Sequence, residues 1–357
     1  MKRIVFMGTP DFAVQVLEKL SQNKDWEIVA VVTQPDRPRG RGQRLSFSPV
    51  KEKALELGLN VLQPERVREE VFIRQLIKLR PDLIVVAAFG QILPEAVLSI
   101  PPHGCLNVHA SLLPAYRGAA PIQRVIMEGG EKTGVSIMLM DKGLDTGDVL
   151  AQAEIPLSPG MNCGDLHDCL AQMGAELLQE TIPRWLRGEI KPLAQERITE
   201  RAPSYAAPLK KEDERICWAN SARMIYNQIR ALTPWPGAHT IYEGKPLKIW
   251  EAVPYQPASS EEAAASTAAL ASATTVLTKT KTASTLATTA SIATAKGSSG
   301  AAPGTVVAIV KGQGFVVQTG EGKLLVKQVQ PVGKKPISAQ SFLNGYRLEV
   351  GYVFANI

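Results

Sequence analysis

Two polar residues with complementary chemistry stand two positions apart in an otherwise apolar run, Asn107 and His109 within residues 105–114. In an extended segment, residues two apart share a face, so an amide donor would lie beside an imidazole while Leu106 and Val108 point into the core. Further along, the glycine-punctuated acidic loop 141–148 can bring a carboxylate to this pair. An oxyanion donor, a group that titrates near neutral pH and an orienting carboxylate are the parts of an acyl-transfer site.

The residues leave the nucleophile open. Ser111, two residues beyond His109 on the same face, is a candidate, and direct attack by an amine substrate is equally compatible with the segment. A structural role for the Asn-x-His pair, in which the histidine only completes hydrogen bonds at a strand end, is the competing interpretation.

A metal centre is not favoured. None of the four cysteines has C-x-x-C spacing, and Cys163, His167 and Cys169 lie in a stretch with the pattern of an amphipathic helix, residues 164–178. The acidic loop lacks the spacing and terminal glutamate of an EF-hand. We therefore expect no metal cofactor and no disulfide framework, which is typical of a reducing compartment.

The segments that must position these residues alternate between strand and helix patterns. The apolar run 2–7 ends at Gly8, after which Thr9 suits the N-cap and Pro10 the first position of a helix. Further strands are predicted at 26–33, 83–88 and 135–139, and helices at 50–58 and 71–79. This alternation predicts an α/β, Rossmann-like domain with a parallel sheet. Because Gly8 is followed by Thr-Pro-Asp, the G-x-G-x-x-G fingerprint is absent, which argues against NAD or FAD.

An arginine-rich stretch, residues 34–49, interrupts this domain without any hydrophobic periodicity. We expect a mobile surface loop, and its four arginines are Arg37, Arg39, Arg41 and Arg44. The guanidinium group stays charged and pairs bidentately with phosphate oxygens. The loop therefore favours contact with a polyanion over a merely solvated surface.

Charge is distributed unevenly along the chain. Residues 1–205 hold 24 basic and 25 acidic side chains, whereas residues 206–357 hold 16 and 9, a net charge of −1 against +7. Clustered lysine and arginine displace counterions from phosphates, so the second part suggests a nucleic-acid partner. With 45% hydrophobic residues the composition is typical of a globular protein, and no apolar run approaches the roughly 20 residues of a membrane span. We expect a cytoplasmic protein with no membrane contact.

The second domain, residues 206–357, is predicted to follow a linker at 201–208. A helix with Trp218, Ala222, Ile225, Ile229 and Leu232 on one face comes first, followed by short strands at 239–242, 247–253, 304–310, 314–319, 323–329 and 347–353. Several short strands joined by glycine turns predict a small β-barrel of the OB type. Residues 256–303, almost entirely Ala, Ser and Thr, interrupt it and have little to bury, so we expect disorder or weak helix there.

Taken together, these motifs resemble the formyltransferases that use 10-formyltetrahydrofolate. The resemblance is carried by 107–109, 111–114, 116–118, 134–136 and 141–147, supported by the start 6–13, the arginine loop and the basic barrel. It covers nearly the whole chain except about 256–303, and it implies formyl transfer to the α-amine of methionyl initiator tRNA.

The resemblance also implies roles for individual residues. Asn107 and protonated His109 would stabilise the oxyanion formed when the amine attacks the formyl carbon, and Asp145 would keep His109 charged and assist proton removal through water. Backbone groups at strand ends would enclose the pterin of the co-substrate. The residues so implied are Phe89, Gly90, Gln91, Ile92, Leu93, Pro94, Ser111, Leu112, Leu113, Pro114, Asp141, Gly143 and Leu144. The four loop arginines would grip the acceptor end of the tRNA, and Lys245 and Lys248 its backbone.

Two other functions remain compatible with the sequence. One is a folate-dependent formyltransferase acting on a small amine such as a sugar nucleotide, although a small substrate needs neither the arginine loop nor the basic barrel. The other is a non-catalytic RNA-binding protein, which the intact trio Asn107, His109 and Asp145 argues against. No obligate protein partner is evident.

Overall fold

The computed structural model describes residues 1–39, 44–256 and 300–355. The chain divides into two compact units. The first comprises Met1–Glu214 with Arg230–Gly237, and the second comprises Arg215–Ile229 with Ala238–Ile357. None of the helices in the described ranges is both long and apolar enough to cross a membrane.

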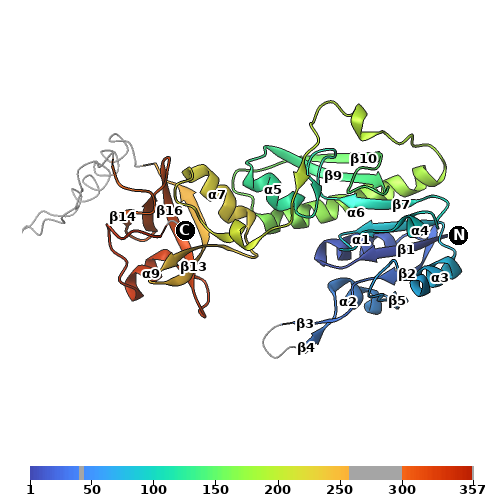
Figure 1. Ribbon diagram of the computed structural model, residues 1–357, viewed down its shortest axis with the longest axis horizontal. Coiled ribbons are helices and arrows are strands. Elements are labelled where there is room, and N and C mark those ends of the chain that lie inside the picture. The colour runs from blue at the N-terminus through green and yellow to red at the C-terminus, as the bar shows by residue number, and fades with distance from the viewer. Residues whose placement is uncertain (40–43, 257–299, 356–357) are drawn as a thin grey trace, which may run out of the picture. The chain divides into compact units, whose positions relative to one another are not determined.

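The first unit is built on a seven-stranded sheet in the order β10-β9-β7-β6-β1-β2-β5 (Figure 1). Its strands are β1 (Lys2–Gly8), β2 (Trp26–Val32), β5 (Val61–Leu62), β6 (Leu83–Ala87), β7 (Cys105–His109), β9 (Lys132–Leu139) and β10 (Val149–Pro156). Five strands that are neighbours in this order, β7, β6, β1, β2 and β5, pair in parallel. This confirms the predicted α/β fold. The sheet differs from the prediction at one side, because β9 runs antiparallel to β7 and β10 antiparallel to β9.

Helices cover both faces of this sheet, as residues alternating along each strand require. Ile4 and Phe6 of β1 join one core with helices α1 (Asp11–Ser21), α2 (Pro49–Glu56), α5 (Pro121–Met127) and α6 (Cys163–Leu186). Val5 and Met7 join the other core with α3 (Glu70–Leu79) and α4 (Glu95–Leu98). All helices and strands predicted in this half are present.

The start of α1 differs from the prediction. Pro10, not Thr9, is the N-cap residue, and it makes no side-chain capping bond. The Thr9 hydroxyl instead donates to the carbonyl oxygen of Phe89 at 3.0 Å. The predicted cap is wrong because a hydroxyl at a strand end also has acceptors on the neighbouring strand's loop, which local sequence does not reveal.

The arginine-rich stretch is a β-hairpin and not an irregular loop. Strands β3 (Arg37–Arg39) and β4 (Arg44–Ser46) pair antiparallel, with Arg37 opposite Ser46. Each strand has only three residues, too few to show a two-residue hydrophobic period, so the sequence pattern did not indicate them. Arg37 is exposed; Arg41 lies outside the described residues, as do the side chains of Arg39 and Arg44.

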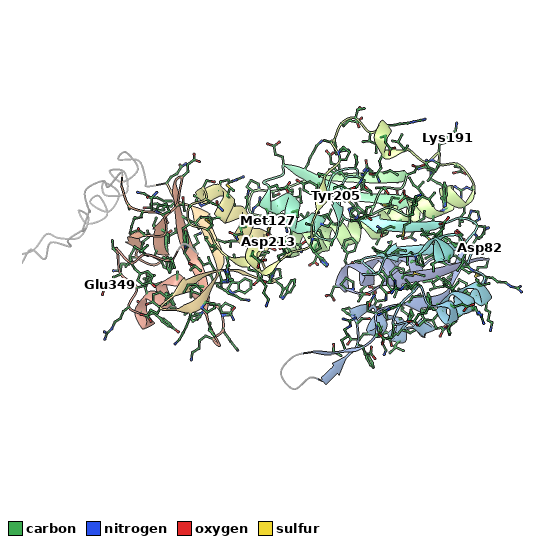
Figure 2. All side chains as sticks on the ribbon, viewed as in Figure 1. Asp82, Met127, Lys191, Tyr205, Asp213 and Glu349 are labelled. Atoms are coloured by element: carbon green, nitrogen blue, oxygen red, sulfur yellow. The ribbon has the colours of Figure 1, made fainter. Side chains whose placement is uncertain are left out.

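The segment predicted as a linker, 201–208, is anchored to the first unit. Tyr205, labelled in Figure 2, begins β11 (Tyr205–Ala206), which pairs in parallel with β8 (Arg117–Gly118). A little further on, the carboxylate of Asp213 accepts two hydrogen bonds from the guanidinium of Arg124. The chain therefore leaves the first unit only after Glu214.

The second unit contains a mostly antiparallel sheet in the order β12-β13-β16-β15-β14, with β17 paired to β16. Its elements are α7 (Ala222–Ala231), β12 (Ala238–Tyr242), β13 (Lys245–Pro254), β14 (Val306–Val310), β15 (Gly314–Gln318), β16 (Lys323–Pro331), β17 (Ile337–Ser338) and α9 (Ala339–Gly345). Trp218 precedes α7 instead of lying on it, and its indole donates to Thr240 at 3.0 Å. The OB-type barrel stays a prediction.

One predicted strand in this unit, 347–353, is wrong. Of its residues only Val353 forms a β-bridge, an isolated one with Thr305, although Gly351 and Tyr352 also hydrogen-bond to the backbone of Val306. The apolar residues of this segment pack individually instead of forming a strand face. Leu348 and the following Phe354 are buried, and the Tyr352 ring contacts the Phe354 ring. The low-complexity stretch 256–303 lies, apart from its ends, outside the described residues.

Candidate active site

Asn107 and His109 lie on β7, between β6 and β9 near the centre of the sheet. Leu106 and Val108 point into the core that contains α6, so the two polar side chains share the opposite face. Asn107 is 9% exposed and His109 6% exposed. Buried polar side chains need hydrogen-bond partners: Asn107 has one in the loop after β9, and His109 has one in the loop after β7.

The partner of Asn107 is the carboxylate of Asp145. Its Oδ1 accepts from Asn107 Nδ2 at 3.4 Å, and its Oδ2 lies 3.6 Å from His109 Nδ1, an ion-pair distance longer than a hydrogen bond. The backbone N–H of Gly118 donates to the same Oδ2 at 2.8 Å. The structure thus brings together the three residues that the sequence singled out.

The ring of His109 is oriented from both sides. Nε2 lies 2.9 Å from the carbonyl oxygen of Tyr116, and a carbonyl can only accept, so Nε2 carries a proton. Nδ1 faces the carboxylate of Asp145. Both ring nitrogens therefore face oxygen acceptors, which fixes the orientation of the ring.

The antiparallel direction of β9 places the Asp145 loop. Leu139 pairs with Leu106 at the start of β7, so the loop begins there and must fold over the face that carries Asn107 and His109. Gly147 allows a close approach: a Cβ at this position would lie 1.9 Å from the carbonyl oxygen of Leu139. Asp145 itself has φ of 54°, in the left-handed region.

Ser111 and the two buried cysteines, Cys105 and Cys163, are poor nucleophiles in this arrangement. Ser111 is fully buried, and its hydroxyl donates to the carbonyl oxygen of Ala115 at 2.7 Å. Burial raises the pKa of the Cys105 thiol and of the Cys163 thiol to about 12, so neither forms a thiolate near neutral pH. Across the described ranges, His, Cys, Asp and Glu side chains form no cluster of three or more that could hold a metal ion.

The loop after β6 presents backbone groups and an exposed apolar side chain. Ala88 and Gly90 have φ of 44° and 86°, and Ile92 is 81% exposed while Phe89 and Leu93 are buried. Within the part of the chain that the structure describes, the N–H and C=O groups from 90 to 93 have no hydrogen-bond partner. They are available to a ligand with donors and acceptors on its edge.

The other residues expected around the pterin lie in two loops. In the loop after β7, Leu113 N donates to Ser136 Oγ, and Leu112 and Leu113 are buried ahead of Pro114. In the Asp145 loop, Asp141 accepts from the backbone N–H of Gly143, and Leu144 is 53% exposed.

Sequence patterns did not indicate Gln195, which is 1% exposed and donates hydrogen bonds to backbone carbonyls of the Asp145 loop. It stands in a short 3-10 helix, Gln195–Arg197, in a stretch without motif or periodicity. The Gln195 amide oxygen accepts two hydrogen bonds from the guanidinium of Arg117. Arg117 belongs to the segment 116–118, which contributes to the family resemblance but from which no role for this arginine was predicted.

The residues expected to contact tRNA belong to both units, and each group is described by itself. In the first unit Asp36 anchors the base of the arginine hairpin, because Lys51 and Gln63 donate to its carboxylate and lower its pKa. In the second, Lys245 is exposed at the start of β13, and Lys248 Nζ lies 5.4 Å from the centre of the Trp250 ring.

Family models match both parts of the chain. A model described as formyl transferase matches residues 1–182, and one described as formyl transferase, C-terminal domain, matches residues 208–347. Among solved structures, a sugar 3N-formyl transferase, WlaRD, matches with a TM-score of 0.56 at 17% identity, covering 94% of this chain and 99% of that one. HypX from Aquifex aeolicus matches with a TM-score of 0.57 at 16% identity over 97% of this chain and 47% of its own. The family models define the class as formyl transferases, and the fold agrees with it.

Curated relatives narrow this class. Methionyl-tRNA formyltransferases from Bacillus licheniformis and Symbiobacterium thermophilum are 45% and 46% identical to this chain. The alignments cover 98% and 99% of this chain and 97% and 96% of the relatives. The chain belongs to the methionyl-tRNA formyltransferase family, and it is an enzyme.

Proposed function

We propose that this protein transfers the formyl group of 10-formyltetrahydrofolate to the α-amine of methionyl initiator tRNA, giving N-formylmethionyl-tRNA for translation initiation. The observation that carries the proposal is the buried cluster in which one carboxylate, Asp145, contacts both Asn107 and His109. Because charged tRNA is used in translation, the proposed compartment is the cytoplasm.

Asn107 and His109 act as the donors for developing charge. When an amine adds to a formyl carbon, negative charge grows on the formyl oxygen, and preoriented donors in a water-poor site stabilise it. The Asn107 amide has a second hydrogen besides the one it gives to Asp145, and an imidazolium at His109 would add positive charge beside it. Asp145, through a water molecule, also receives the proton that the amine loses.

The co-substrate supplies the activated formyl group, and the loop after β6 fits its pterin. The unpaired backbone groups at 90–93 can bond to the donor and acceptor edge of the ring, and exposed Ile92 and Leu144 offer apolar surface. Phe89, Leu93 and the segment 111–114 support these contacts from the buried side.

Strong base catalysis is not required for this reaction. A free α-amino group has a pKa of about 7.7 to 8.0, so a fair fraction is already unprotonated at neutral pH. The work of the site is therefore orientation and charge stabilisation, which suits a cluster with no activated serine or cysteine.

The arginine hairpin and the basic second unit serve the tRNA. Arg37, Arg39, Arg41 and Arg44 would contact phosphates near the acceptor end, and Lys245 and Lys248 would contact the tRNA backbone. A small amine acceptor would have no use for either group.

The decisive test is transfer of labelled formyl from 10-formyltetrahydrofolate to methionyl initiator tRNA, with uncharged tRNA and free methionine as negative controls. His109→Ala should abolish transfer, whereas His167→Ala should retain it. The control histidine is half-buried on α6, and its contacts go to Phe12 and Asp168, outside the cluster. Tight tRNA binding by the wild type without transfer would refute the proposal and leave an RNA-binding protein. Loss of transfer in both variants would mean that the effect of His109→Ala is not evidence for a catalytic role of His109.

A further inference from the structure

We propose that Gln195 and Arg117 are positioning residues for the reaction: Gln195 fixes the backbone of the Asp145 loop, and Arg117 fixes the orientation of the Gln195 amide. The inference rests on the proposed function for the chemistry it serves. The hydrogen-bond geometry on which it depends is independent of the substrate.

The amide nitrogen of Gln195 ties two carbonyls of the loop together. Nε2 donates to the carbonyl oxygen of Asp145 at 2.8 Å and to that of Gly147 at 2.7 Å. Its two hydrogens are thereby both used, inside a site where Gln195 is 1% exposed. These bonds brace the backbone at the residue whose φ is 54°, a conformation that an unsupported aspartate rarely keeps.

Arg117 decides which way the amide points. Its Nε and Nη2 donate to Gln195 Oε1 at 3.0 and 2.7 Å. A flipped amide would set its N–H groups against the guanidinium donors and its oxygen against two carbonyl oxygens, leaving every partner unsatisfied. Arg117 is only 9% exposed, and no carboxylate in the described ranges lies within ion-pair distance of its guanidinium. A neutral amide is thus its principal acceptor.

The same short strand also contacts the carboxylate directly. Arg117 and Gly118 form β8, and the Gly118 N–H donates to Asp145 Oδ2 at 2.8 Å. β8 therefore holds Asp145 twice, at the carboxylate through Gly118 and at the backbone through Arg117 and Gln195. The consequence is a carboxylate whose position relative to His109 depends on both contacts.

Gln195→Met removes the amide at nearly constant side-chain volume. We expect the single-turnover rate of formyl transfer to fall 10- to 100-fold, because displacing a reacting group by about 1 Å costs on the order of 10². KM for methionyl-tRNA should change less than about threefold, since the hydrogen bonds of Gln195 go to the Asp145 loop and to Arg117, neither of which is a proposed tRNA contact. The control is Thr181→Val, which deletes another buried hydrogen bond, to Leu177 O within α6, and should leave the rate unchanged.

A double-mutant cycle separates positioning from general destabilisation. If Gln195 acts through Asp145, adding Gln195→Met to Asp145→Asn should lower the rate by less than about threefold further, because the two effects share one path. If the rate of the double variant falls by the product of the two single-variant losses, the proposal is overturned. If Gln195→Met does not fold, Arg117→Lys tests the same path, because lysine lacks the fixed fork that holds the amide.

Hydrogen exchange at the Gly118 amide gives a readout that needs no substrate. We expect at least tenfold faster exchange in Gln195→Met than in Thr181→Val, because the Asp145 acceptor is released. An inactive wild type with this acceleration would refute the proposed function and leave the positioning role intact. An active enzyme whose rate and exchange are both unchanged by Gln195→Met would refute the positioning role alone.

Discussion

Asp145→Asn isolates the charge of the carboxylate from its shape. Asparagine is one of the few residues that tolerate the left-handed backbone of this position, where φ is 54°, so the loop should keep its conformation. Its amide oxygen can still accept from the Gly118 N–H, which now meets Asp145 Oδ2 at 2.8 Å. What the variant loses is the negative charge beside His109 and the acceptor for the long Asn107 hydrogen bond, because an amide N–H group replaces Oδ1.

The distance sets the size of the effect. Opposite unit charges 3.6 Å apart attract by about 4.6 kcal/mol at an effective dielectric constant of 20. If the transition state needs an imidazolium, loss of this attraction slows transfer by about 2000-fold at most, since each 1.4 kcal/mol is about tenfold. The amide oxygen retains part of the attraction, so we expect a loss of about 10² to 10³.

A single-turnover assay with both substrates saturating measures this step directly. Binding of methionyl-tRNA, followed separately by filter retention, should be unchanged, because Asp145 is not among the proposed phosphate contacts. A loss below tenfold would refute the electrostatic role of the carboxylate and leave it a purely structural acceptor.

Three further predictions address the loop, the pH dependence of stability and the tRNA. Gly147→Ala should reduce kcat about 100-fold, because the new Cβ would meet the Leu139 carbonyl oxygen at 1.9 Å and the loop must shift; a kcat within threefold of wild type would contradict this. Arg124 hydrogen bonds lower the pKa of Asp213 below its ordinary 3.8, so their stabilisation is present above that pH and lost as pH falls through the folded-state pKa. Asp213→Asn should therefore lower the free energy of unfolding by about 1 kcal/mol at pH 7 and by almost nothing at pH 2 in urea titrations, and an equal loss at both pH values would argue against the ion pair. KM for methionyl-tRNA should rise about 40-fold between 50 and 200 mM salt if three phosphates are neutralised, whereas a flat KM would exclude phosphate contact.

The failures of sequence reasoning share one physical cause. The arginine hairpin is held by backbone pairing between β3 and β4, and the segment at 205–206 by pairing with β8, so neither leaves a hydrophobic period. Thr9 bonds to a loop from another strand. Where burial of a side-chain face sets the structure, as in β1, β6 and α6, the pattern in the sequence was sufficient.

In the site, too, local sequence patterns and long-range contacts determine different features. The sequence by itself determined that Asn107 and His109 share a strand face, because a two-residue repeat is a local property of extended chain. Only the tertiary structure decided that β9 runs antiparallel beside β7, which folds the Asp145 loop over that face, and that Gln195 secures the loop from 50 positions along the chain. Strand direction and long-range hydrogen bonds depend on which distant segments pack together, and no local spacing records that choice.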